Sequence, residues 1–212
     1  MRKNIFIRLL IAVIGQITAA LGIALLIEAG IGLGPVDAFN TASSQLIFLT
    51  VGTMTILFNF VCVIGQIVIW RKNLAPIQYL QFPVAILFGA MIDFFLIYVL
   101  TFDTQSYLFS WVVFIMGILV LTFSLGAINS IQVIFSPLEG FCQALASITR
   151  FEFVQYRWAA DVILIILAFI FMLIGADSVL REGTIAMMVF FSPLLNFFMK
   201  KQTLWFQNIG LI

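Results

Sequence analysis

The chain has 212 residues, of which 64% are hydrophobic and 9% are charged, and its formal net charge is +1. An ordinary soluble domain has about 25% charged residues, so this composition excludes a water-soluble globule, and it equally excludes a disordered chain, which needs low hydrophobicity. We therefore expect an all-α polytopic membrane protein that forms a single membrane domain over residues 1–212, has the lipid bilayer as a partner and binds no nucleic acid.

Six stretches are long and apolar enough to cross a bilayer, because a spanning helix needs about 20 apolar residues. In chain order they are residues 6–28, 52–70, 77–100, 109–131, 155–175 and 183–199. The first stretch carries several small residues, namely Ala19, Ala20, Gly22 and Ala24. Such residues predict a close helix contact, either within the chain or between the subunits of a homo-oligomer.

Two shorter segments, residues 35–49 and 137–149, each begin with proline and carry a carboxylate two residues later, Asp37 or Glu139. Proline and an acidic residue are both typical of a first helical turn. Fifteen helical residues, the longer of the two lengths, rise about 22 Å, which is less than the hydrocarbon thickness of about 30 Å. The six residues before each segment reach about 20 Å when extended. We therefore predict two re-entrant half-helices, with eight full crossings as the alternative.

The basic residues predict the orientation of the chain. With re-entrant half-helices, nine of the ten basic residues lie on the side of the N-terminus, and only Arg181 lies opposite. The nine are Arg2, Lys3, Arg8, Arg71, Lys72, Arg150, Arg157, Lys200 and Lys201. Eight crossings would give seven against three. Basic residues collect on the cytoplasmic side, so we expect both termini to be cytoplasmic.

An offset of 102 residues aligns the chain partly with itself. It places Gly34–Phe39 on Ser136–Phe141 and Asn59 on Asp161, and one more residue of shift places Asp93 on Asn196. We interpret this as a duplication with repeats at 1–102 and 103–212. Three spans per repeat is an odd number, so the two repeats would insert in opposite orientations, an arrangement typical of transporters and channels.

Ionisable and polar groups at membrane depth are expensive and indicate functional positions. The candidate substrate- or ion-binding residues are Asp37, Glu139, Asp93, Asp161, Asn59, Asn196, Gly34, Pro35 and Pro137. The carboxylates among them have no basic partner that the sequence places deep in the membrane. They would relay or coordinate a cation, or bind a cationic substrate.

Each candidate also has a structural interpretation. Asp37 and Glu139 would cap their own half-helices. Asp93 and Asp161 would form interhelical hydrogen bonds to Asn196 and Asn59, respectively. The glycines of the 30–34 connection would line a cavity or simply allow close packing of the backbone.

The run from Gly30 to Ala38, together with Gly183-Thr184 and Ser192-Pro193, resembles the YczE/YitT-like bacterial integral membrane proteins. Val36 stands where that family usually has an aromatic residue. The resemblance implies a bacterial plasma-membrane protein and implies no settled activity.

We expect a transporter or channel for a small solute, coupled to a cation through the buried carboxylates. The alternative is a membrane scaffold or regulator of a partner protein that transports nothing. His is absent, and no nucleophile–base pair or metal-ligand spacing is visible. We therefore expect no enzymatic activity, no cofactor and no metal; only an Asp37/Glu139 dyad would offer acid–base chemistry.

Overall fold

The computed structural model describes residues 2–71, 74–100, 106–131 and 136–211, with side chains from Ile5 onward. This part of the chain is all-helical and contains eight α-helices. They are α1 (Arg2–Ala29), α2 (Pro35–Leu46), α3 (Val51–Trp70), α4 (Gln81–Phe94), α5 (Tyr107–Ile131), α6 (Pro137–Ile148), α7 (Phe153–Ile174) and α8 (Glu182–Asn208). A 3-10 helix (Pro76–Leu80) precedes α4, and a π-helical turn (Phe95–Val99) follows it.

Six of these helices, with the turns that flank α4, are long and apolar enough to cross a membrane. They coincide with the six predicted stretches, so the protein is a multi-pass membrane protein. The two remaining helices, α2 and α6, have 12 residues each. Their existence and their prolines at the first turn agree with the sequence pattern.

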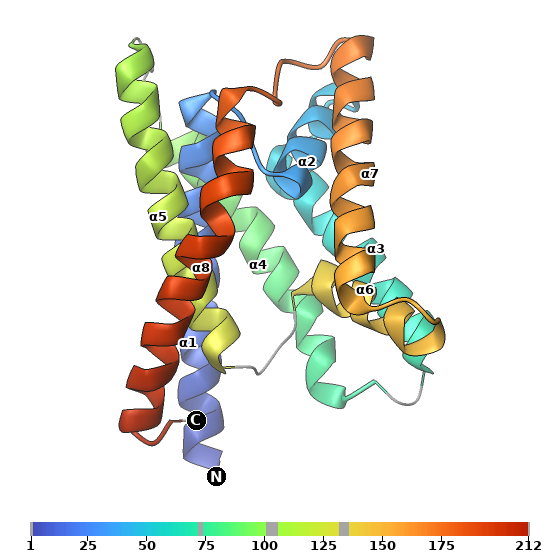
Figure 1. Ribbon diagram of the computed structural model, residues 1–212, viewed down its shortest axis with the longest axis vertical. Helices are drawn as coiled ribbons and strands as arrows, with labels where there is room; N and C mark the ends of the chain where they lie inside the picture. The colour runs from blue at the N-terminus through green and yellow to red at the C-terminus, as the bar shows by residue number, and fades with distance from the viewer. Residues whose placement is uncertain (1, 72–73, 101–105, 132–135, 212) are drawn as a thin grey trace.

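The helices pack as two groups (Figure 1). In one group α1 lies against α4 and α5, and α5 lies against α8; in the other, α2 and α6 each pack against both α3 and α7. The contact between α3 and α4 joins the two groups. Helices that are far apart in the sequence thus pack together, since α2 packs on α7 and α6 packs on α3.

The contact between α1 and α5 confirms the prediction made from small residues. Ala19, Ala20 and Ala24 are fully buried. A Cβ atom on Gly22 would lie 2.8 Å from the backbone nitrogen of Leu121, so only glycine allows this approach. The predicted close contact therefore forms within the chain.

Both termini lie at the same end of the molecule (Figure 1). The short helix α2 lies toward the opposite end, and α6 lies toward the end with the termini. The two short helices thus occupy different halves of the long dimension of the bundle.

The last helix extends beyond the predicted segment 183–199, reaching Asn208. The predicted segment ends before Lys200 because the hydropathy of the sequence falls there. Lysine is nevertheless a good helix former, so the helix continues. The ammonium group of Lys201 lies 4.5 Å from the centre of the Phe197 ring, so the basic residues pack along the helix instead of ending it. The helix ends just before Gly210, which has a φ of +67°.

The crossing of α3 and α4 depends on two glycines. A Cβ atom on Gly89 would lie 2.4 Å from the carbonyl oxygen of Gly52, and one on Gly52 would lie 2.0 Å from the carbonyl oxygen of Gly89. Neither contact can be relieved by a side-chain rotation, because the opposing atom belongs to the backbone.

We predict that Gly89→Ala lowers the stability by about 1–3 kcal/mol, the usual cost of overpacking. The measurement is the midpoint of thermal unfolding in detergent. Gly34→Ala is the control, because its new Cβ would find its nearest atom, the Met187 methyl group, at 3.4 Å. Equal midpoints for the two variants would show that the α3–α4 crossing can relax.

Candidate functional site

The short helices α2 and α6 begin in the same way. The N-cap residues are Gly34 and Ser136, neither of which caps its helix through a side chain, and a proline follows each. Asp37 and Glu139 lie in the first turns. Their carboxylates make no hydrogen bond to any other described residue, so the capping interpretation is not realised as a hydrogen bond.

A basic side chain of α7, Arg157, lies beside one of the candidate carboxylates and near two others. Its guanidinium pairs with Asp161 at 3.1 Å, and both side chains are only partly exposed. The same guanidinium is within electrostatic reach of Asp37 and Glu139. We call Asp37, Glu139, Asp161 and Arg157 the carboxylate cluster.

The expectation that these carboxylates have no basic partner is therefore wrong for Asp161. In the sequence, Arg157 stands near the start of a span and is predicted only as a charge on the side of the N-terminus. The spacing of four residues between Arg157 and Asp161, which places both on one helix face, was the signal that could have found the pair.

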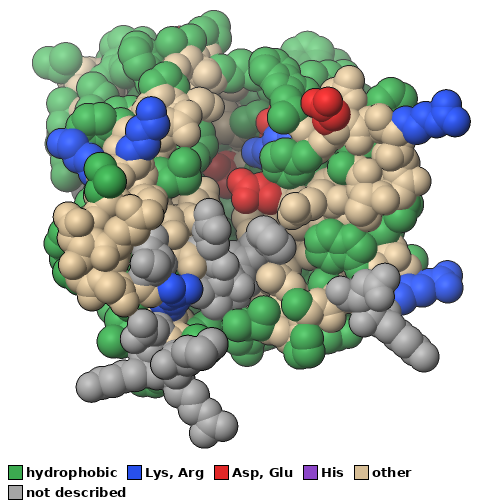
Figure 2. Space-filling view, turned by 60° about the horizontal axis from the view of Figure 1, so that its bottom comes forward, with side chains coloured by type: hydrophobic (Ala, Val, Ile, Leu, Met, Phe, Trp, Pro, Cys, Tyr) green, Lys and Arg blue, Asp and Glu red, His purple; other side chains and the backbone are tan. Residues whose placement is uncertain are grey.

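Figure 2 shows the face of the molecule at the end that carries the termini. Acidic side chains and a basic one lie in a hollow near the centre of this face, away from the basic side chains of its rim. Charged groups on this face thus lie in the hollow as well as around the rim.

The polar character of α2 continues beyond its first turn. Asn40 is 1% exposed and Thr41 is 5% exposed. Neither the amide atoms of Asn40 nor the hydroxyl of Thr41 has a hydrogen-bond partner among the described residues. Three and four residues separate them from Asp37, so all three side chains share one face of the helix. Buried polar groups normally have partners, so this face has spare hydrogen-bonding capacity for water or a ligand.

Asp93 lies outside the carboxylate cluster, at the junction of α3 and α4. Its carboxylate accepts hydrogen bonds from the backbone nitrogen of Gly52 at 2.7 Å and from the hydroxyl of Thr50 at 2.6 Å. It therefore fastens α4 to the first turn of α3. The predicted partner Asn196 is exposed on α8, so that interhelical hydrogen bond is not formed.

Asn59 likewise makes no hydrogen bond to Asp161, whose carboxylate faces Arg157 instead. Asn59 and Pro137 line a separate cavity between α1, α3, α4, α5 and the start of α6. The structure thus divides the candidate residues between the cluster, this cavity, the α3–α4 junction and the surface.

The glycine-rich connection 30–34 is packed against the start of α8. The backbone nitrogen of Leu33 donates to the Val179 carbonyl at 3.1 Å, and the nitrogen of Gly183 donates to the Ile31 carbonyl at 2.7 Å. Residues 31–34 are buried. The close-packing interpretation of this connection therefore describes it better than the cavity wall does.

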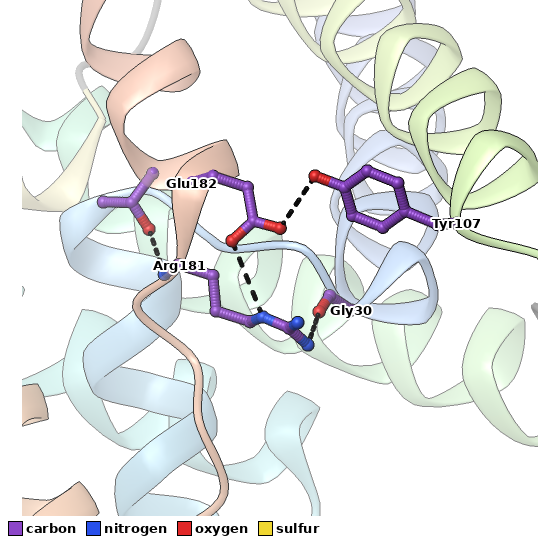
Figure 3. A network of polar contacts seen from close by, with 5 residues as sticks. Gly30, Tyr107, Arg181 and Glu182 are labelled. Carbon is purple, nitrogen blue, oxygen red and sulfur yellow. Dashed lines mark hydrogen bonds and ion pairs between the residues drawn. The ribbon is translucent and has the colours of Figure 1, made fainter.

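Side chains reinforce this junction (Figure 3). Arg181 donates from Nη1 to the Gly30 carbonyl at 3.0 Å, and its Nε lies 3.8 Å from the Glu182 carboxylate. The Tyr107 hydroxyl donates to the other oxygen of Glu182 at 3.0 Å. The network joins the start of α5, the start of α8 and the connection after α1.

We predict that Asp93→Ala destabilises the protein more than Asp161→Ala. Removing Asp93 leaves the Gly52 nitrogen without its charged acceptor, a loss of about 1.5–3 kcal/mol. Removing Asp161 breaks a partly exposed ion pair, which contributes about 1 kcal/mol or less. Thermal unfolding of both variants in the same detergent checks this order, and the opposite order would mean that the ion pair holds α7 in place.

Comparison with known proteins identifies no relative with an assigned activity. The chain matches no curated protein and no solved structure. Residues 6–200 match a family described as a family of unknown function, DUF6198. Because this match covers nearly the whole chain, the protein belongs to the DUF6198 family of unknown function.

Proposed function

We propose that the protein is a transporter or channel for a small solute, coupled to a cation at the carboxylate cluster. The observation that carries the proposal is that carboxylates from two separate short helices lie within electrostatic reach of one arginine. Asp37 comes from α2 and Glu139 from α6, and the arginine is Arg157 of α7. Arg157 pairs directly with Asp161. The cluster thus has three carboxylates and one guanidinium, and this acidic excess suits a cation such as H⁺ or Na⁺.

We further propose that α2 and α6 are re-entrant half-helices of two inverted repeats. Each has 12 residues and therefore rises about 18 Å, which is too short to cross a core of about 30 Å. The packing supports the repeats, because exchanging the halves converts the α2–α7 contact into the α6–α3 contact, and both exist. The exchange also converts the α1–α4 contact into α5–α8.

The two halves are not packed alike, which supports alternating access. α3 packs closely on α4, whereas α7 and α8 form no comparable contact in the described part of the chain. At the α2 end, Gln45 and Asp177 also exchange two hydrogen bonds, of 2.8 and 3.1 Å. We propose that this end is closed and that the face with the hollow is open.

The common end of the two termini and the distribution of basic residues support cytoplasmic termini in a bacterial plasma membrane. The resemblance to the YczE/YitT-like proteins belongs to the same proposal. An enzymatic role is not part of it. The scaffold alternative gains support from the connection 30–34, which is buried and hydrogen-bonded, as the centre of a non-transporting protein would be.

We predict that Asp37→Asn or Glu139→Gln abolishes cation movement while the protein stays folded, because the amide keeps the shape and loses the charge. The measurement uses liposomes that contain the purified protein, with H⁺ entry followed by an internal pH-sensitive dye and Na⁺ entry by ²²Na⁺. Glu152→Gln is the matched control, because this residue is exposed at the start of α7 and glutamine can still serve as its cap.

Wild-type rates in both Asp37→Asn and Glu139→Gln would contradict the cation role of the cluster. A wild-type protein that moves neither cation would contradict the coupling altogether and favour the scaffold.

A further inference from the structure

A polar cavity lies between α1, α3, α4, α5 and the start of α6, apart from the carboxylate cluster. Its volume is about 100 Å³. Polar side chains from four helices line it: Gln16 from α1, Asn59 from α3, Gln81 from α4 and Asn129 from α5. No charged side chain is among its described lining residues.

Three of these amides are free to bind a ligand. Gln16, Asn59 and Asn129 make no hydrogen bond to any other described residue, and all three are partly exposed. Each amide offers two donor hydrogens and an acceptor oxygen. A ligand between them would therefore meet both donors and acceptors on several sides.

The fourth amide is part of a fixed wall. Gln81 is 1% exposed and exchanges two hydrogen bonds of 3.1 Å with Gln66. Gln66 also donates to the Pro137 carbonyl at 2.9 Å, which holds the start of α6 in place. A Cβ atom on Gly140 would lie 2.5 Å from Oε1 of Gln66, so α6 accommodates this wall through a glycine. The amides of Gln66 and Gln81 are thus already paired, and the three amides without a partner among the described residues remain for the ligand.

The volume limits the size of the ligand. An apolar cavity of about 150 Å³ accepts benzene, with six heavy atoms, and one water occupies about 30 Å³. A cavity of about 100 Å³ therefore holds about three waters, or a solute of about four heavy atoms.

We infer that this cavity binds a small neutral solute of the carboxamide or urea class, which has both donors and acceptors and no charge. The binding site itself does not depend on the proposed function. The statement that its ligand is the transported solute does rest on that function. Under the 102-residue offset Asn59 corresponds to Asp161, so one half would present a neutral amide where the other presents a charge. Solute and cation would then occupy separate sites.

Acetamide and acetate form a matched pair of probes, because they share shape and size and differ in charge. Ligand-observed saturation-transfer NMR on the detergent-solubilised protein detects such weak binding. We expect a saturable acetamide signal and no acetate signal. Asn59→Leu and Asn129→Leu keep the branched shape of the side chain and lose the hydrogen bonds, so each should weaken acetamide binding at least about fivefold. Asn196→Leu, on the exposed face of α8, should leave it unchanged.

Equal binding of acetate, or unchanged acetamide binding in both Asn59→Leu and Asn129→Leu, would overturn the inference. If one variant fails to fold, Gln16→Met replaces it, with the same expected loss. Uptake of acetamide into liposomes separates the two proposals. If the protein binds acetamide but does not take it up, the binding site stands and the transport function is contradicted. If it takes up a solute but does not bind acetamide, the transport function stands and the binding site is contradicted.

Discussion

Backbone hydrogen bonding is the constraint on which this structure depends. A short helix leaves its flanking backbone groups without helical partners, and a bilayer would offer none. In the first half the protein supplies them from the second half, since the connection 30–34 bonds through Leu33 to Val179 and through Ile31 to Gly183. The side chain of Arg181 adds a bond to the Gly30 carbonyl. The placement of α2, and with it Asp37, thus depends on residues about 150 positions away.

Charge compensation makes the carboxylate cluster possible. An isolated buried carboxylate is costly, and a nearby guanidinium offsets part of this cost. Arg157 pairs with Asp161 and is within electrostatic reach of Asp37 and Glu139, so one basic residue partly offsets three acidic ones. The acidic residues outnumber the basic one, and under the proposed function this excess is what a cation would bind.

Composition and the positions of proline predicted the helices, because membrane spans follow from hydropathy and proline marks the start of a short helix. Asp37 and Glu139 were assigned to the first turns of α2 and α6 for the same reason. The partners of the polar residues could not be predicted, because they depend on how distant helices pack. Asp93 bonds to Gly52 and Thr50 only because two glycines bring α3 and α4 together. The predicted segment 183–199 was shorter than α8, because hydropathy reports which residues suit the membrane and not how far the helix extends.

The central claim is that α2 and α6 approach one shared site from opposite sides of the membrane. The most direct measurement is labelling of single cysteines at Phe48, which follows α2 and is 94% exposed, and at Ile148, which ends α6 and is 64% exposed. A membrane-impermeant maleimide should react with the cysteine at position 48 in intact cells and with the one at position 148 only after the membrane is permeabilised. Reaction of both from the same side would contradict the claim, because eight full crossings place both positions in one compartment.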